Sequence, residues 1–558
     1  MPAKIQANWW AFSAFLFFAL SPLFAAEKNS STRPNIVLIL ADDLGFSDLG
    51  CYGSEISTPN LDRLAGEGLR FTQFYNCARC CPTRASLLSG LYPHQAGIGQ
   101  MMQDLGKPGY RGELNEHCVT MAEVLRDAGY HTAMAGKWHV NHMKFTGKAQ
   151  LNFENADPFW ENKNNWPLQR GFEKYFGTIH GVCSYYDPFS LVRDNEPIRA
   201  EGKNFYYTDA ITENATQFIT DFSKTSKPFF LYVAYTAPHW PLQAPAEAIA
   251  KYEQKYLEGW DVLRERRREK MIQLGLIDKT WPLSSRPKNV PAWNDAPNKK
   301  WEAHRMATYA GMIDRMDQGI GKILQTLDQR GLTTNTLVLF LSDNGGCAEN
   351  VQPGWYDIPS RTRNGRAIRV GNDPKVLAGA DDVWQSYGPQ WANLSDTPFR
   401  LFKHWAHEGG IATPLIARWP AQIKAEGKIS NAVGHVIDFM PTFLEAAGAN
   451  YPNKFQNNEI VPLEGKSLLP ILKKQSAIAE RPLFWEHEGN RAVRLGKWKL
   501  VAEHKKNWEL FDLEKDRSEL NDLAATEPEK VRQLSELYEA WAKRCGVLPW
   551  EDLKRAAK

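Results

Sequence analysis

Residues 35–43 read Asn-Ile-Val-Leu-Ile-Leu-Ala-Asp-Asp, a continuous aliphatic run that ends in two carboxylates. An apolar run without alternation is typical of a strand that is covered on both faces, as in a parallel sheet between layers of helices. In such sheets the functional residues collect just beyond the carboxyl ends of the strands. The stretch therefore predicts a buried central strand and a functional role for Asp42 and Asp43.

Strand-like and helix-like segments alternate along the chain after this run. His239 follows a second buried apolar run, and Asp343-Asn344 follow a third, so these side chains are expected to converge with Asp42 and Asp43. The alternation predicts an α/β fold with a large, central, mostly parallel sheet flanked by helices. The predicted strands are 35–41, 130–135, 229–235 and 336–341, and the predicted helices are 59–68, 120–128 and 306–329.

The sequence pattern changes after residue 430. Short strand-like segments with hairpin-like glycine turns follow a helix, and a charged helix closes the chain. We therefore predict a large domain at 27–430 and a smaller C-terminal subdomain at 431–558, with an antiparallel sheet and a helix. Two long stretches, 252–300 and 348–395, are predicted to be loops that cover a functional site. The C-terminal helices are expected at 437–447 and 527–544, and the strands at 483–486, 491–495 and 499–501.

Charge and composition restrict the partners and the compartment. The 67 basic and 64 acidic residues give a net charge of +3, so no global field favours nucleic acid or an anionic membrane surface. Residues 1–26 contain Lys4, an apolar run and a final Ala25-Ala26, which together predict a signal peptide. An uncleaved N-terminal anchor is the alternative. We expect an exported, periplasmic or extracellular protein with no nucleic-acid partner and no stable membrane association.

Two further segments contain groups that are able to carry chemistry. The first reads Cys-Cys-Pro-Thr-Arg-Ala-Ser-Leu-Leu-Ser-Gly over residues 80–90. Pro82 suits the first turn of a helix and Gly90 its end, so Cys80 is expected at a helix N-terminus, where free N–H groups favour anions. The simpler interpretation is a buried, inert cysteine beside a helix cap. The second segment, 129–139, reads Gly-Tyr-His-Thr-Ala-Met-Ala-Gly-Lys-Trp-His and by itself indicates a strand that ends in a basic loop.

Both segments resemble signatures of the formylglycine-dependent sulfatases, of the bacterial arylsulfatase type in the alkaline-phosphatase-like superfamily. The first signature is a Cys followed by x-Pro-x-Arg and then, five residues after the Arg, Ser or Thr before Gly. Cys81 does not have Pro and Arg at these distances, and Thr83 stands where the family often has Ser or Ala. The resemblance covers roughly residues 33–545, and it implies that 27–430 is the sulfatase catalytic domain. The matching residues are Cys80, Pro82, Arg84, Ser89 and Gly90.

The resemblance also implies one bound calcium ion. Asp42, Asp43, Asp343 and Asn344 match the metal-binding positions of the family, and formylglycine generated from Cys80 completes the set. Carboxylate and amide oxygens suit a hard cation such as calcium better than zinc or copper. A single Asp-Asp or Asp-Asn-Gly after a strand is more often a turn. Because Asp42-Asp43 and Asp343-Asn344 both match metal-binding positions of one family, we expect metal ligands here and not simple turns.

The remaining catalytic roles are implied by the resemblance. Lys137 and His139 are expected to face the sulfate, with His139 as the base that releases it. His239, alone or with Lys403, is expected to protonate the leaving oxygen, whereas His404 and His407 are bystanders. The nucleophile would be an oxygen of the formylglycine gem-diol, deprotonated with help from Asp343. Arg84 would hold the formylglycine and its metal ligands in place.

We therefore predict a hydrolase that converts sulfate esters into an alcohol and inorganic sulfate. Its partners would be a sulfated small molecule or carbohydrate and a formylglycine-generating maturation enzyme. A phosphonate or phosphodiester hydrolase of the same superfamily is one alternative, which Asn344 disfavours because those enzymes tend to have His there. A non-catalytic binder of sulfated glycans is another, which the modifiable Cys80 disfavours. Tyr185 and Tyr186 are equally suited to stacking on a substrate ring and to packing. The alcohol, exo or endo action, disulfide pairing and oligomeric state stay open.

Overall fold

The computed structural model describes residues 33–142, 162–202, 204–355, 358–424, 427–473 and 478–556, together with residues 1 and 3. The chain divides into two compact units, Met1–Thr32 and Arg33–Lys558, and the fold below is that of the second unit. The predicted signal peptide at 1–26 lies outside the described residues except for residues 1 and 3, so it stays a prediction. Among the described helices, none combines the length and the apolar character needed to cross a membrane.

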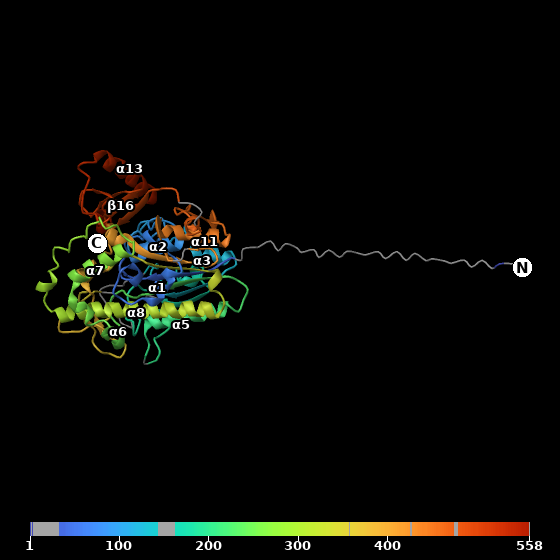
Figure 1. The fold of residues 1–558 in the computed structure, drawn as a ribbon, viewed down its shortest axis with the longest axis horizontal. Helices are drawn as coiled ribbons and strands as arrows, with labels where there is room; N and C mark the ends of the chain where they lie inside the picture. Colours follow the sequence, from blue (N-terminus) through green and yellow to red (C-terminus); the bar gives the residue numbers. More distant parts are fainter. Residues whose placement is uncertain are drawn as a thin grey trace. The chain divides into compact units, whose positions relative to one another are not determined.

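A mixed sheet of ten strands forms the centre of the larger unit (Figure 1). In its middle, β1 (Asn35–Ala41) lies between β8 (Thr336–Ser342) and β7 (Phe229–Ala234) and runs parallel to both. β3 (His131–Gly136) is parallel to β7 on its other side. The full order is β12-β2-β11-β8-β1-β7-β3-β4-β5-β6, with β2 at Leu69–Tyr75, β4 at Lys174–Thr178, β5 at Leu191–Arg193, β6 at Glu196–Pro197, β11 at Ala412–Arg418 and β12 at Lys428–His435.

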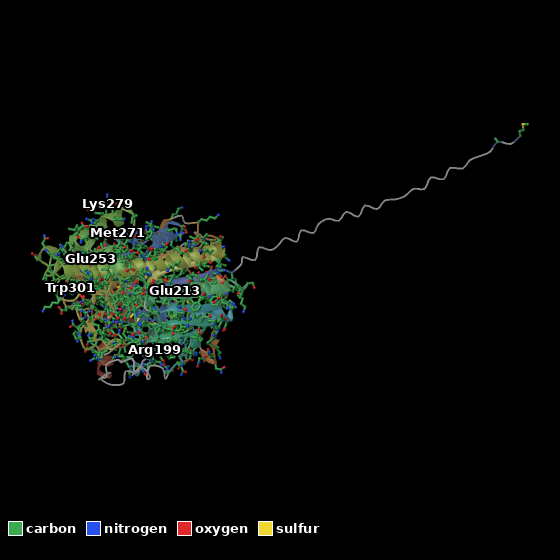
Figure 2. The ribbon with its side chains drawn as sticks, turned by 90° about the horizontal axis from the view of Figure 1, so that it is seen from below. Arg199, Glu213, Glu253, Met271, Lys279 and Trp301 are labelled. Carbon is green, nitrogen blue, oxygen red and sulfur yellow. The ribbon has the colours of Figure 1, made fainter. Side chains whose placement is uncertain are left out.

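The alternating side chains of β1 belong to two separate apolar layers. Val37 and Ile39 share a buried cluster with one group of helices, α1 (Pro59–Gly66), α5 (Tyr207–Phe222) and α8 (Lys299–Gln329). Ile36 and Leu38 share a second cluster with α2 (Cys80–Ser89), α3 (Met121–Asp127) and α11 (Phe439–Ala447). Figure 2 views the first layer from below, with Glu213 of α5 and Trp301 of α8 labelled. Burial on both faces explains why this strand has no polar alternation.

A four-stranded antiparallel sheet follows near the C-terminus, which together with the large sheet confirms the predicted fold class. Its strands are β15 (Leu483–His487), β16 (Asn490–Leu495), β17 (Trp498–Ala502) and β18 (Glu509–Asp512). The helix α13 (Pro528–Cys545) packs on it, and the rings of Phe484 and Trp541 stack with centroids 5.0 Å apart. The predicted domain boundary after residue 430 falls within β12, which pairs with β2 in the large sheet. The division into domains stays a prediction.

The smaller elements connect and cover these sheets. The stretch 252–300, which the sequence predicts to be a loop, contains α7 (Trp260–Gln273), and that part of the prediction is wrong because Arg, Lys and Glu are good helix formers. All eight cysteines are described, and all are free thiols. The remaining described α-helices and strands are α6 (Ala246–Ala250), α9 (Gly388–Ser395), α10 (Glu408–Ile411), α12 (Leu469–Leu472), α14 (Trp550–Ala556), β9 (Arg369–Val370), β10 (Val383–Trp384), β13 (Lys454–Phe455) and β14 (Asn458–Glu459).

A buried ion-pair network connects the C-terminal sheet to the large sheet. Glu408, at the start of α10, accepts hydrogen bonds from Lys499 Nζ at 2.9 Å and Arg517 Nε at 2.7 Å, and all three side chains are fully buried. Burial acts to raise the pKa of Glu408, but Lys499 and Arg517 outweigh it and lower the pKa to about 2. The carboxylate is therefore ionised, and it ties β17 to the segment that contains Lys403.

Candidate active site

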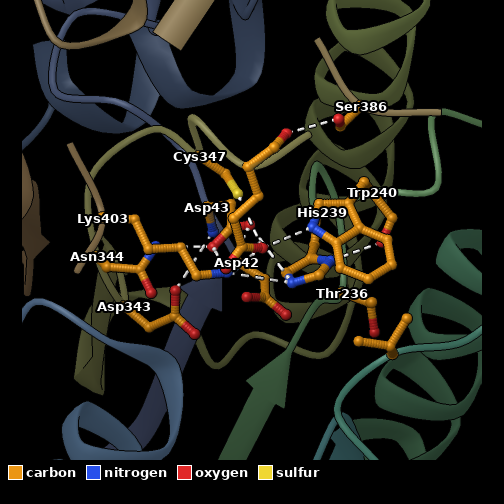
Figure 3. Close-up of polar contacts among 12 residues, drawn as sticks. Asp42, Asp43, Thr236, His239, Trp240, Asp343, Asn344, Cys347, Ser386 and Lys403 are labelled. Atoms are coloured by element: carbon orange, nitrogen blue, oxygen red, sulfur yellow. Dashed lines mark hydrogen bonds and ion pairs between the residues drawn. The ribbon is translucent and has the colours of Figure 1, made fainter. Parts of the chain in front are cut away.

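Two pairs of polar residues meet at the carboxyl ends of neighbouring strands. Asp42 and Asp43 follow β1, and Asp343 and Asn344 follow β8, which is parallel to β1 and in register with it along its whole length. The backbone N–H of Asp43 donates to Asp343 Oδ1 at 3.3 Å, and Asn344 Nδ2 donates to Asp43 Oδ1 at 2.7 Å. All four residues are buried and point toward one another (Figure 3). The predicted convergence of these residues is thus present in the structure.

Arg84 and Lys137 neutralise two of the carboxylates. Arg84 lies on α2, one turn after Cys80, and donates to Asp343 Oδ2 through Nε at 3.1 Å and Nη2 at 2.8 Å. Its Nη1 donates to the carbonyl oxygen of Lys137 at 2.8 Å, and Lys137 Nζ forms an ion pair with Asp42 Oδ2. Arg84 therefore connects the helix that begins at Cys80 to the ends of β3 and β8.

Lys403 and His239 surround the third carboxylate, Asp43. Lys403 Nζ is 2.9 Å and 3.0 Å from the two Asp43 oxygens, and His239 Nε2 lies 3.3 Å from Lys403 Nζ and 3.4 Å from Asp43 Oδ2. His239 Nδ1 faces the carbonyl oxygen of Trp240 at 2.5 Å, so Nδ1 carries a hydrogen and Nε2 is directed toward the cluster (Figure 3). Burial lowers the pKa of His239, and Asp43 opposes that shift.

The first turn of α2 brings Cys80 to the same place. The sulfur atoms of Cys80 and Cys81 and a ring nitrogen of His139 all lie within 4.8 Å of one another, and Cys81 Sγ is 3.2 Å from His139 Nε2. A hydrogen bond from the Cys81 thiol, with the help of His139 and Lys137, lowers the pKa of Cys80 well below its usual value. The contact between Cys81 and His139 is a feature that the sequence motif does not predict.

The backbone of the loop after β3 is specialised around His139. His139 has a φ of +59°, in the left-handed region that non-glycine residues rarely adopt. Its ring packs against Gly181, where a Cβ atom would approach His139 Nε2 to 2.1 Å. A side chain at position 181 would therefore displace the His139 ring. A backbone conformation like that of His139 is often found at functional sites.

The oxygen atoms of the cluster are suited to a hard cation. Asp42 Oδ1 and Asn344 Oδ1 are buried, and neither has a hydrogen-bond partner among the residues that the structure describes. Buried polar atoms are normally satisfied, so these two oxygens are available as ligands for a cation. Burial and the neighbouring Asp343 together raise the pKa of Asp42 to about 7, although Lys137 opposes the shift. Three carboxylates and an amide oxygen fit calcium better than zinc or copper.

The cluster opens into a pocket of about 270 Å³. Cys80, His139, His239 and Lys403 lie in its lining, as expected for residues that face a substrate. A larger cavity of about 590 Å³ contains none of the predicted site residues and lies between residues 275–281 and the C-terminal sheet. The rest of the pocket lining was not predicted, although Trp240 directly follows His239 in the sequence; it includes Arg79, Gln100, Trp240, Glu349, Trp355 and Glu488.

The two tyrosines that were candidates for substrate stacking do not line this pocket. Tyr185 is fully buried, and its hydroxyl group donates to the carbonyl oxygen of Thr236 or His239, at 2.8 Å and 2.9 Å. Its role is to hold the segment that carries His239. The packing alternative therefore describes Tyr185. Tyr186 is partly buried, and its ring lies 5.4 Å from that of Tyr206.

Comparison with protein families places most of the chain in one of them. Residues 34–449 match the family model described as Sulfatase, and residues 399–542 match the model of the N-sulphoglucosamine sulphohydrolase C-terminal region. An arylsulfatase of Klebsiella aerogenes is 34% identical to the chain, over 80% of the chain and 93% of that protein. An uncharacterised sulfatase of Schizosaccharomyces pombe is also 34% identical, over 94% of the chain and 96% of that protein.

Solved structures share the fold. Ps i-CgsB in complex with k-i-k-neocarrahexaose superposes with a TM-score of 0.64 at 24% identity, over 91% of the chain and 93% of that protein. BT4656 in complex with its substrate D-glucosamine-2-N,6-O-disulfate superposes with a TM-score of 0.59 at 22% identity, over 92% of the chain and 98% of that protein. At these identities the likeness establishes the alkaline-phosphatase-like fold and nothing finer.

Proposed function

Because the chain belongs to the sulfatase family and is a sulfuric ester hydrolase, we propose that it hydrolyses sulfate esters with a formylglycine formed from Cys80 and one bound calcium ion. One observation carries this proposal. Asp42, Asp43, Asp343 and Asn344 converge on the site that Arg84 connects to the first turn of α2, and two of their oxygens have no hydrogen-bond partner within the described part of the chain. We propose these four residues as the calcium ligands, together with residue 80.

The charge balance of the cluster suits an anionic substrate. Hydrated formylglycine supplies a hydroxyl nucleophile for sulfur, and calcium supplies positive charge for the sulfate oxygens. Three carboxylates already face Arg84, Lys137 and Lys403, so a divalent cation would give the cluster the excess positive charge that a sulfate ester needs. Preorganised charges of this kind stabilise the transition state without reorganisation.

Proton transfers are assigned to the side chains around residue 80. Asp343 takes up the proton of the nucleophile, and Arg84 holds this carboxylate in position. His239 delivers a proton from Nε2 to the oxygen of the departing alcohol, either from its own imidazolium form or as a relay for a proton of Lys403 Nζ, which lies 3.3 Å from Nε2. His139 serves as the base when sulfate is released.

The relatives suggest the substrate class and the cellular setting. One relative is an arylsulfatase, and another is an N-acetylglucosamine-6-O-sulfatase. The name of the second relative indicates a sulfated sugar as its substrate. We propose a sulfated carbohydrate or a small sulfated molecule as the substrate of this chain. A formylglycine-generating enzyme would be its maturation partner, and export to the periplasm or the medium would follow from residues 1–26.

The proposal is tested by mass spectrometry of a peptide that contains residue 80 and by sulfate release from 4-nitrophenyl sulfate. Conversion of Cys80 to formylglycine lowers the peptide mass by about 18 Da. We expect this mass in the active protein, and a faster reaction with the sulfate than with a matched phosphodiester or phosphonate. An active protein in which residue 80 remains an unmodified cysteine would contradict the proposed nucleophile.

The role of His239 as the acid is tested by leaving-group dependence. Replacing His239 with alanine is expected to lower kcat by about 100-fold or more for an alkyl ester such as glucose 6-sulfate. The same change should have a much smaller effect on 4-nitrophenyl sulfate, because nitrophenolate leaves without a proton. Steady-state kinetics on both esters measure the difference.

The matched control is His407→Gln, because His407 is buried and contacts Arg400 and Glu509 instead of the cluster around Asp43. This variant should affect the two esters equally. Equal losses on both esters in the His239 variant would exclude its role as the acid.

A further inference from the structure

The turn between β15 and β16 brings a carboxylate from the C-terminal sheet into the active-site pocket. Glu488 lies in this turn with a φ of +51° and lines the same pocket as Cys80 and Lys403. Its side chain is 24% exposed, so its charge is directed into a confined space rather than into bulk solvent. The group that faces Glu488 would be the alcohol part of a substrate whose sulfate lies on the cluster around Asp43.

Glu488 is ionised and retains capacity to accept hydrogen bonds. Gln100 Nε2 donates to Glu488 Oε1 at 2.9 Å, and a carboxylate accepts about four hydrogen bonds. Burial acts to raise the pKa of Glu488, but His487, Gln100 and Arg79 outweigh it and lower the pKa to about 2. Burial keeps His487 itself neutral, with a pKa of about 3, so Gln100 and Arg79 are the partners that act near neutral pH.

A nearby histidine places a ring nitrogen toward this carboxylate. His404 Nδ1 is 3.6 Å from Glu488 Oε2, and Asn490 Nδ2 donates to His404 Nε2 at 3.1 Å. The orientation of the Asn490 amide is set by two backbone groups, since Nδ2 also donates to His487 O and Oδ1 accepts from His504 N. His404 Nε2 is therefore an acceptor, and Nδ1 carries a hydrogen toward Glu488.

Two more polar atoms belong to residues that line the same pocket as Glu488. Gln100 Oε1 and Arg79 Nε are buried, and neither has a hydrogen-bond partner in the part of the chain that the structure describes. Arg79 Nη1 donates to Glu349 Oε1 at 2.8 Å, so the charge of Arg79 is already balanced by a second carboxylate. This part of the pocket thus offers acceptors at Glu488 and Gln100, a donor at Arg79 and an excess of negative charge.

A hydroxyl group suits both the acceptors and the donor in this part of the pocket, because it donates to a carboxylate and accepts from a guanidinium. An ammonium group accepts nothing and is repelled by Arg79, and an anion is repelled by Glu488 and Glu349. Trp240 and Trp355, with ring centroids 5.5 Å apart, add an apolar surface to the same pocket.

We propose that Glu488, with Gln100 and Arg79, forms a subsite that selects a neutral, polyhydroxylated alcohol and excludes a second anionic group close to the ester. This inference rests on the proposed function, because it requires the sulfate to be bound at the cluster around Asp43. Glu488 is then a specificity-determining residue, contributed by a part of the chain far from the sulfatase signatures.

The test uses inhibition of 4-nitrophenyl sulfate hydrolysis by sugars that differ at one carbon. Glucose 6-sulfate, glucosamine 6-sulfate and glucosamine 2-N,6-O-disulfate carry a hydroxyl, an ammonium and an anionic group at carbon 2, and N-acetylglucosamine 6-sulfate controls for bulk. In the wild-type enzyme the inhibition constant of the disulfate should exceed that of glucose 6-sulfate by about tenfold or more. Equal constants, or no inhibition by glucose 6-sulfate, would overturn the proposal.

The variant Glu488→Gln should change the two constants in opposite directions. The constant for glucose 6-sulfate should rise about tenfold, because a charged acceptor is lost, and the constant for the disulfate should fall. A purely structural role would raise both constants together, and that result would refute the subsite. Glu539→Gln, on the exposed face of α13, removes the same charge away from the pocket and should change neither constant. Absence of wild-type turnover of 4-nitrophenyl sulfate, measured before any sugar is added, would refute the proposed function instead.

Discussion

Replacing Cys80 with alanine is expected to lower kcat for 4-nitrophenyl sulfate by about 10⁵-fold or more, because the nucleophile of the proposed reaction is lost. Removal of a nucleophile is among the largest single-residue effects on an enzyme, and the cations around Asp43 do not substitute for it. Cys80 is only 2% exposed, so a water molecule has little room to replace the side chain of residue 80 as the nucleophile. Initial rates at saturating substrate measure the effect.

The matched control is Cys77→Ala, which removes a buried thiol three residues earlier in the chain. Cys77 Sγ lies 3.8 Å from His435 Nε2 and does not line the pocket, so this variant should keep most of its turnover. Thermal unfolding of both variants separates loss of chemistry from loss of folding. Full turnover in the Cys80 variant would eliminate the formylglycine mechanism.

The variant Asp42→Asn is expected to lower kcat/KM by about 100- to 1,000-fold when calcium is scarce, with partial recovery when calcium is added in excess. Asp42 Oδ1 is one of two oxygens of the proposed calcium ligands that have no hydrogen-bond partner among the described residues, and the change leaves an oxygen at this position while removing its charge. The affinity for the cation should therefore fall without disappearing. Titration of activity with calcium after treatment with a chelator measures the shift.

A second readout of this variant does not depend on turnover. Binding of calcium to the folded wild-type protein should raise its unfolding temperature, and the Asp42 variant should need more calcium for the same increase. The control is Asp396→Asn. Burial raises the pKa of Asp396 well above its usual value, which favours the neutral carboxyl, so replacement with the neutral amide is expected to change the calcium requirement little. A wild-type protein whose stability and activity ignore both chelator and calcium would exclude the proposed metal.

The central strands were predictable because their signal is local. The apolar runs of β1, β7 and β8 have no alternation, and burial on both faces is the physical cause. β11 was missed because Pro414 removes a backbone donor in the middle of the strand. The structure accommodates it with a register shift between Thr413 and Leu415. β2 was missed because Arg70 and Gln73 interrupt its apolar pattern.

The pocket wall was not predictable from the sequence. Arg79, Gln100, Glu349 and Glu488 come from four separate segments, and none belongs to a motif. The orientation of Glu488 depends on the docking of the C-terminal sheet, which the buried contacts of Glu408 with Lys499 and Arg517 fix in place. Contacts between residues so far apart in the chain have no local signature.

The sequence by itself determined the chemical groups of the site, because strand ends and a helix start place Asp42, Asp43, Asp343, Asn344 and Cys80 by short-range rules. Only the tertiary structure decided which groups touch. The pairing of β1 with β8 sets the Asp43–Asn344 contact, and the fold brings Cys81 against His139 and Glu488 into the pocket. The physical reason is that backbone propensities act over a few residues, whereas packing joins segments hundreds of residues apart.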